Sequence, residues 1–144
     1  MQDVKEIARR AIEDPWRGKL DDVLELVDDN YVGHAPGMPE PIRGKQGLRE
    51  FFNAYLTAFP DGGITVDEII AEGDRVSSRW TARGTHTGDL MGMPPSGRQA
   101  TVTGITFSRI VDGKLREDWI TWDSLSLMQQ LGAVPEISAA GTRA

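Results

Sequence analysis

The chain has 144 residues, which is long enough for one domain to bury its own core without a disulfide or a metal ion. It has no cysteine, and this excludes disulfides, thiolate metal ligands and a cysteine nucleophile. The net charge of -6 and the sequence pI of about 4.9 argue against nucleic acid as a partner, because phosphates bind clustered basic side chains.

Three of the first six residues are charged, and this segment contains no apolar signal core. No later apolar run approaches the ~20 residues that a membrane-spanning helix needs. We therefore expect a cytoplasmic protein with no membrane partner. A neutral or weakly polar hydrophobic small molecule is the partner that the composition favours.

Three segments in the first half of the chain have the apolar spacing of amphipathic helices, namely residues 4–12, 20–27 and 44–59. Asp14-Pro15 ends the first pattern and Pro60 ends the third, because proline cannot continue a helix. Tyr31-Val32 predicts a short extended piece. Residues 33–41 contain too many prolines and glycines for regular structure and predict a loop.

After Pro60 the apolar period falls to two, which predicts strands over residues 64–72, 75–83, 98–111 and 115–122. Gly73-Asp74 and Asp112-Gly113 are hairpin signals between consecutive strands. The period changes again at Asp123-Ser124, where a last helix begins, and Gly132 stands where a C′ glycine belongs. We expect residues 1–132 to form a single domain and residues 133–144 a flexible tail.

Three helices, a run of antiparallel strands and a closing helix predict an α+β fold. The small residues Gly84 and Gly104 in the long strands allow the sheet to bend sharply. We expect the three N-terminal helices to pack on the concave face of a strongly curved sheet. The space left between the two layers is then a conical pocket and the default ligand site.

Short motifs between Tyr31 and Gly132 carry a resemblance to a known family, and the similarity extends over nearly the whole chain from the first helix to Gly132. They are Tyr31–Pro36, Ala58–Asp61, Glu72–Val76, Gly84–Gly88, Gly92–Arg98, Asp112–Lys114, Asp123 and Gln130–Gly132. This set is similar to the SnoaL-like polyketide cyclases, also called ester cyclases, within the NTF2-like superfold. The resemblance implies a cone-shaped α+β barrel, usually dimeric. It also implies an intramolecular aldol-type cyclisation that needs neither a metal nor a cofactor.

In this resemblance, Asp123 matches the catalytic aspartate of the family. A base that removes a proton next to a carbonyl group needs a raised pKa, which burial in an apolar pocket would give it. His34 and His86 are the candidate hydrogen-bond donors for the enolate that forms. Each of the three residues also has a structural interpretation. In this interpretation Asp123 serves solely as the N-cap of the last helix, and each histidine serves solely to form a hydrogen bond with a backbone group.

The predicted substrate-binding side chains are Tyr55, Trp80, Met91, Met93, Phe107 and Trp119. Alternation along the last strand puts Trp119, Thr121 and Asp123 on one face and Trp122 on the other, provided that no bulge intervenes. We expect a homodimer through the outer sheet face, formed by Trp122 together with Ala100, Val102 and Ile110.

The loop of residues 89–97 predicts a lid over the pocket, because its methionines adapt to varied ligand shapes. Two histidines and one carboxylate could hold iron, but their spacing does not indicate a metal site.

Three other functions remain open on the same fold. Epoxide hydrolysis needs two carboxylates around an arginine; Arg116 and Asp118 alternate onto one strand face, close to the hairpin turn. Steroid isomerisation needs a tyrosine and a protonated acid, for which Tyr31 and Tyr55 are the available tyrosines. A non-catalytic module that only binds a small molecule is the third alternative.

Overall fold

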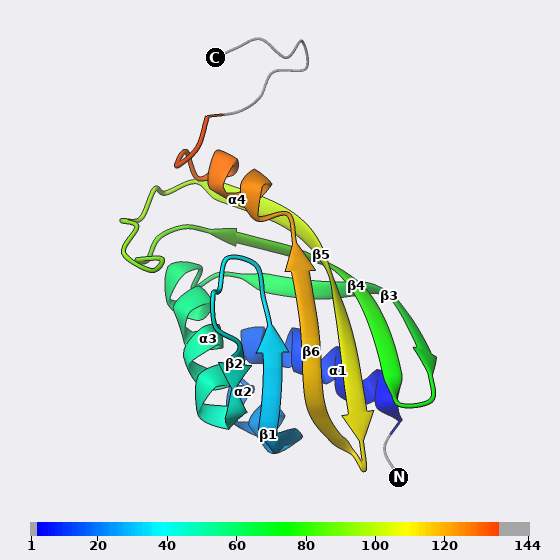
Figure 1. The fold of residues 1–144 in the computed structure, drawn as a ribbon. Coiled ribbons are helices and arrows are strands. Elements are labelled where there is room, and N and C mark those ends of the chain that lie inside the picture. Colours follow the sequence, from blue (N-terminus) through cyan, green and yellow to red (C-terminus); the bar gives the residue numbers. More distant parts are fainter. Residues whose placement is uncertain (1–2, 136–144) are drawn as a thin grey trace.

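The computed structural model describes residues 3–135, which form a curved six-stranded sheet with helices on its concave side (Figure 1). The strands are β1 (Val27–His34), β2 (Ile42–Arg43), β3 (Gly63–Glu72), β4 (Arg75–Thr85), β5 (Gln99–Val111) and β6 (Lys114–Trp122). Their order is β2-β1-β6-β5-β4-β3. Neighbours are antiparallel except β1 and β6, which run parallel. The predicted α+β fold is confirmed. Residues 136–144 of the predicted tail lie outside the described residues.

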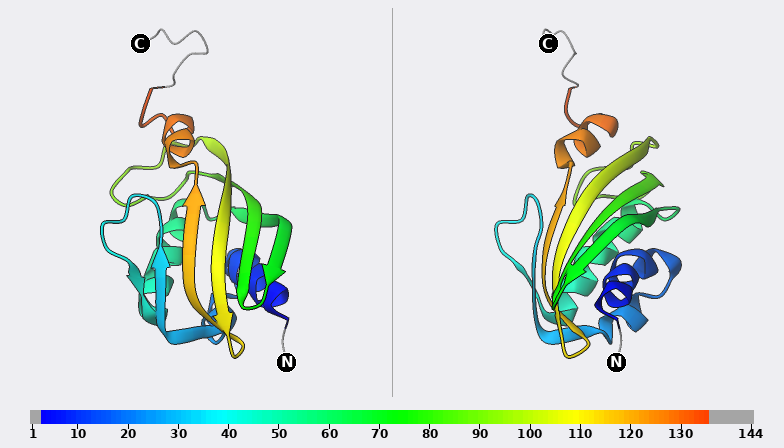
Figure 2. Two further views of the ribbon diagram at one scale, coloured as in Figure 1. Left: turned by 45° about the vertical axis from the view of Figure 1, so that its right-hand side comes forward. Right: turned by 90° about the vertical axis from the view of Figure 1, so that its right-hand side faces the viewer.

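The helices are α1 (Val4–Glu13), the 3-10 helix η1 (Asp14–Arg17), α2 (Leu20–Leu24), α3 (Gly44–Ala58) and α4 (Ser124–Gln130). Figure 2 shows the sheet curving around α1 and α3, while α4 follows the far end of β6. The apolar stripes of α1 and α3 face the sheet, as their spacing predicts. No helix within residues 3–135 is long and apolar enough to cross a membrane.

The second helix is shorter than its apolar stripe predicts, because Val27 belongs to β1 and pairs with Leu115 of β6. Long-range pairing thus overrides a local helical pattern at this point. The two hairpins form where they were predicted. Asp112 and Gly113 have φ values of 54° and 75°, as the type I′ turn between β5 and β6 requires.

A β-bulge at Arg116 decides which side chains of β6 face the helices. Ile110 of β5 lies opposite Leu115, and the preceding Arg109 lies opposite Glu117, so Arg116 is the extra residue. One extra residue reverses the face of every side chain that follows it. Asp118 therefore lies on the same concave side as Leu115, and it is buried.

Beyond the bulge, Trp119 and Thr121 share one face and Trp122 lies on the other, as alternation predicts. The face that carries Trp119, however, is the convex one, away from the helices. Ala100, Val102 and Ile110 of β5 are buried on the concave side together with the partly buried Trp122. The prediction that these four residues form the outer face is therefore wrong. Both faces of β5 carry apolar residues, so its pattern alone did not tell the two sides apart.

Candidate active site

A cavity of about 130 Å³ lies between the concave face of the sheet and the helices α1 and α3. Its walls are mainly aromatic and aliphatic, and they include Ile12, Phe51, Tyr55, Trp80, Ile120 and Trp122. Among the acidic residues that the structure describes, Asp118 alone lines this cavity. A single carboxyl group in an apolar pocket is the arrangement in which burial changes acid strength most.

Both oxygens of the Asp118 carboxylate accept a hydrogen bond from a hydroxyl group. Ser108 Oγ donates to Oδ1 over 2.7 Å, and the Tyr31 hydroxyl donates to Oδ2 over 2.9 Å. Burial raises the pKa of Asp118 to about 6, although these two hydrogen bonds favour the charged form and lower it. The negative charge of Glu117 raises this pKa further. The result is a carboxylate that can take up and return a proton near neutral pH.

Tyr31 reaches Asp118 because Gly33, two residues further along β1, has no side chain. A Cβ atom at Gly33 would lie only 2.5 Å from the Tyr31 hydroxyl oxygen. Burial, with a further contribution from the charge of Asp118, raises the pKa of Tyr31 well above its usual value. The phenol is therefore a neutral donor toward the carboxylate at physiological pH.

Asp123 does not line the cavity. It is exposed at the end of β6, where its Oδ1 accepts a hydrogen bond of 2.9 Å from the backbone N–H of Ser126 and caps α4. The prediction that Asp123 faces the pocket is wrong. Because the bulge at Arg116 adds one residue to β6, Asp118 faces the cavity, whereas Trp119 and Asp123 do not.

His34 lies on the convex face of the sheet. Its Nε2 is 2.9 Å from Glu117 Oε2, and its ring stacks on Trp119 with 5.5 Å between centroids. Phe107 also packs against Trp119, with 5.8 Å between the two ring centroids. The structure therefore brings His34, Phe107 and Trp119 together, but outside the cavity in which they were expected.

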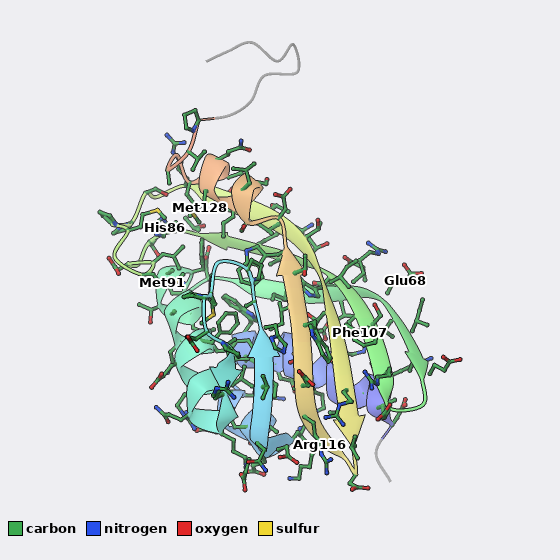
Figure 3. The ribbon with its side chains drawn as sticks, in the orientation of Figure 1. Glu68, His86, Met91, Phe107, Arg116 and Met128 are labelled. Carbon is green, nitrogen blue, oxygen red and sulfur yellow. The ribbon has the colours of Figure 1, made fainter. Side chains whose placement is uncertain are left out.

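His86 is completely buried, but it holds a loop and does not line the cavity. Its Nδ1 accepts a hydrogen bond of 3.1 Å from the backbone N–H of Ser96 and lies 3.0 Å from Ser96 Oγ. Figure 3 shows His86 and Met91 at the end of the molecule where the 89–97 loop lies. His86 thus anchors that loop, and its ring packs on Phe59 with 5.5 Å between centroids, behind the cavity wall that Phe59 helps to form.

The predicted methionine contacts of the lid are absent from the cavity wall. Met91 is 70 % exposed, and Met93 packs against a cluster that includes Leu90 and Ala58. Leu90, which is buried, packs this loop against the core. Of the six predicted substrate-binding residues, Tyr55 and Trp80 line the cavity.

Sequence reasoning missed Asp118, Tyr31 and Ser108 as a group. One signal was present: Asp118 alternates with Ile120 and Trp122, so an acid occupies an otherwise apolar strand face. Its closeness to the hairpin turn suggested a position far from the pocket. Within residues 3–135, no three histidine, aspartate or glutamate side chains are close enough to share a metal ion.

Residues 6–131 match the sequence profile of the family described as SnoaL-like polyketide cyclase. The chain belongs to the SnoaL-like polyketide cyclase family. The resemblance drawn from the short motifs is thereby confirmed, and so is the cyclase class that it implied.

Two relatives from Streptomyces illustrate the SnoaL-like similarity. The aklanonic acid methyl ester cyclase DnrD of Streptomyces peucetius is 34 % identical over 134 residues, which cover 88 % of this chain and 89 % of DnrD. The nogalonic acid methyl ester cyclase of Streptomyces nogalater is 30 % identical over 118 residues, covering 80 % of this chain and 87 % of the relative.

Two solved structures have the same architecture as this SnoaL-like chain. IdmH of Streptomyces antibioticus has a TM-score of 0.80 and 32 % identity, covering 91 % of this chain and 99 % of IdmH. AclR of Streptomyces galilaeus has a TM-score of 0.81 and 27 % identity, covering 95 % of this chain and 85 % of AclR. The predicted NTF2-like fold with a curved sheet is confirmed by these neighbours.

Proposed function

We propose that this SnoaL-like protein closes a ring in a polyketide-derived ester or ketone, with Asp118 as general base and then general acid. The observation that carries the proposal is the Asp118 carboxyl group, held by two hydroxyl donors in the wall of an apolar cavity. The substrates in the names of the relatives, methyl esters of aklanonic and nogalonic acid, suit such a cavity because an ester carries no charge.

The reaction consists of two proton transfers around one carbon–carbon bond. Asp118 removes a proton from the carbon between or beside carbonyl groups, and the electron pair of that C–H bond passes to the carbonyl oxygen as an enolate. The enolate carbon then attacks a second carbonyl carbon in the same molecule. The alkoxide that results takes its proton from Asp118. Every proton and electron is accounted for, so the proposed step needs no cofactor.

The surroundings of Asp118 suit both halves of this cycle. With a pKa of about 6, the carboxylate is mostly ionised at pH 7 and yet a stronger base than an exposed aspartate. The hydrogen bonds from Ser108 and Tyr31 fix the carboxylate plane, and each oxygen keeps a second lone pair for the substrate.

The geometry favours this reaction over the two other enzymatic alternatives. Epoxide hydrolysis needs a second carboxylate and an arginine beside the first, but Arg116 sits in the bulge and pairs with Asp28 and Asp112. Steroid isomerisation needs a second, protonated acid in the pocket. Among the described residues, Asp118 is the single acid in the cavity wall.

Matched asparagine variants test the proposal with aklanonic or nogalonic acid methyl ester as probe. D118N keeps the size of the side chain and one acceptor oxygen but cannot accept the proton, so kcat should fall by at least ~10². D123N is the control and should keep activity within about twofold, because asparagine also caps a helix well. A folded D118N variant with wild-type turnover would refute the general base. Binding of the esters without turnover by the wild-type protein would instead indicate a non-catalytic binding module.

A further inference from the structure

The enolate in the proposed reaction needs a hydrogen-bond donor at its oxygen, and neither histidine expected for this role lines the cavity. We propose that the hydroxyl group of Thr106, oriented by Trp80, is that donor. This inference rests on the proposed function, because it assumes that Asp118 removes the substrate proton. Removing a single donor of this kind from an enzyme typically costs ~10²–10³ in kcat.

Most other donors around the cavity are already engaged or lie elsewhere. Ser108 Oγ donates to Asp118, and Trp80 Nε1 donates to Thr106. The indole N–H of Trp16 has no hydrogen-bond partner among the described residues, but the nitrogen atom is buried and is not exposed at the cavity surface. Arg83 pairs with Thr101, between the inward-facing Ala82 and Gly84, so its side chain belongs to the convex face.

Two remaining donors lie at the opposite end of the cavity from Asp118. Trp122 is four residues further along β6, which corresponds to about 13 Å. Tyr55 packs edge-on against Trp122, with 5.7 Å between ring centroids, so it lies at that same end. Neither is close enough to contact the oxygen next to a carbon that Asp118 deprotonates.

Thr106 has the required spacing from Asp118. On β5, Ser108 lies directly opposite Asp118, and Thr106 lies opposite Ile120, two residues along on the same concave face. The Cα atoms of diagonal neighbours of this kind are roughly 7–8 Å apart, and their Cβ atoms are somewhat closer. A substrate carbon in contact with Asp118 at about 3–3.5 Å places its carbonyl oxygen two bonds further on, within hydrogen-bonding reach of the Thr106 hydroxyl.

The contacts of Thr106 also orient its proton. Its Oγ1 accepts a hydrogen bond of 3.0 Å from Trp80 Nε1, and both side chains are buried. Within residues 3–135, no hydrogen bond uses the Thr106 hydroxyl as donor, and this residue lines the cavity. The Trp80 indole is held against Gly104, where a Cβ atom would overlap it. A hydroxyl that accepts one hydrogen bond becomes a better donor in the next.

The Thr106 hydroxyl takes no part in proton transfer in this scheme. Its O–H bond stays intact while Asp118 takes the carbon-bound proton and negative charge grows on the carbonyl oxygen. When the new C–C bond forms, that oxygen returns to a neutral carbonyl and its hydrogen bond to Thr106 weakens. The donor thus stabilises the enolate more than it stabilises the substrate, which is the condition for raising kcat.

Three threonine variants test the donor. T106V removes the hydroxyl at constant shape and should lower kcat about a hundredfold to a thousandfold, with KM changed less than about threefold. T106S restores the hydroxyl and should recover most of that loss. T103V is the control, since Thr103 is exposed on the convex face of the same strand. If T106V folds poorly because the Trp80 N–H loses its acceptor, the W80F/T106V double variant removes both partners.

The dependence of kcat/KM on pH separates this role from an effect through Asp118. A donor to the substrate lowers the rate at every pH and leaves the acid limb where the wild type has it. A shift of the acid limb in T106V would show that Thr106 acts on Asp118, and wild-type kcat in folded T106V would exclude the donor role. In either case an inactive D118N leaves the proposed function intact, whereas an active D118N removes the basis of both.

Discussion

The Tyr31 hydroxyl donates a hydrogen bond of 2.9 Å to Asp118, although the two residues are 87 positions apart in the chain. Tyr31 comes from β1 and Asp118 from β6, the pair of strands that runs parallel in an otherwise antiparallel sheet. The position of β1 beside β6 therefore supplies the donor that the last strand alone lacks. Ser108 on β5 supplies the other donor from the opposite side.

These two donors should set the acid limb of the pH–rate profile. Both hydrogen bonds lower the pKa of Asp118, and that of Ser108 does so more strongly. Y31F and S108A should therefore both move the acid limb of kcat/KM to higher pH, with the larger shift in S108A. A shift to lower pH in either variant would contradict the assignment.

Gly33 should also affect the acid limb of kcat/KM, through its contact with Tyr31. G33A places a methyl group only 2.5 Å from the Tyr31 hydroxyl oxygen and so displaces it from Asp118, which should reproduce the shift of Y31F. The G33A/Y31F double variant should show no further shift, because the two changes remove one hydrogen bond. Additive shifts would mean that Gly33 acts on the site by another route.

Asp118 should also make stability depend on pH. Its pKa is about 6 in the folded protein and 3.8 in a free aspartate, so the folded state holds the proton more strongly. This stabilisation is complete below pH 3.8 and is lost as pH rises through 6, by up to about 3 kcal/mol. The free energy of unfolding of the wild type relative to D118N should therefore fall between pH 4 and pH 7. Urea unfolding at both pH values measures the difference, and an unchanged difference would contradict the raised pKa.

The local sequence pattern predicts the helices and strands well, but it does not predict which face of the sheet each side chain occupies. Helical spacing identified α1 and α3, and Asp112-Gly113 identified the hairpin, because these features depend on neighbouring residues. The bulge at Arg116 and the parallel pairing of β1 with β6 depend on contacts between distant segments. One extra residue in β6 was enough to exchange Asp123 for Asp118 as the carboxylate in the cavity. The fold could thus be predicted, together with the cavity positions of Tyr55 and Trp80, whereas the carboxylate and its donors could not.

We propose that the convex face is the homodimer interface, with different residues from those predicted. Ile105, Phe107 and Trp119 are 38 % to 49 % exposed and lie together on β5 and β6. An apolar patch of this kind on a sheet face favours burial against a second copy. F107R should shift sedimentation at micromolar concentration from dimer to monomer. L125R is the control, because Leu125 is also exposed but lies on α4, and a monomeric wild type would exclude the interface.

The proposed reaction requires a carboxyl group in the cavity that exchanges a proton near neutral pH. The most direct test is an NMR titration of the side-chain carboxyl carbons, in which the Asp118 signal is assigned as the one absent from D118N. We expect its midpoint at about 6. A midpoint near 3.8, the value of a free aspartate, would exclude the raised pKa and with it the general base.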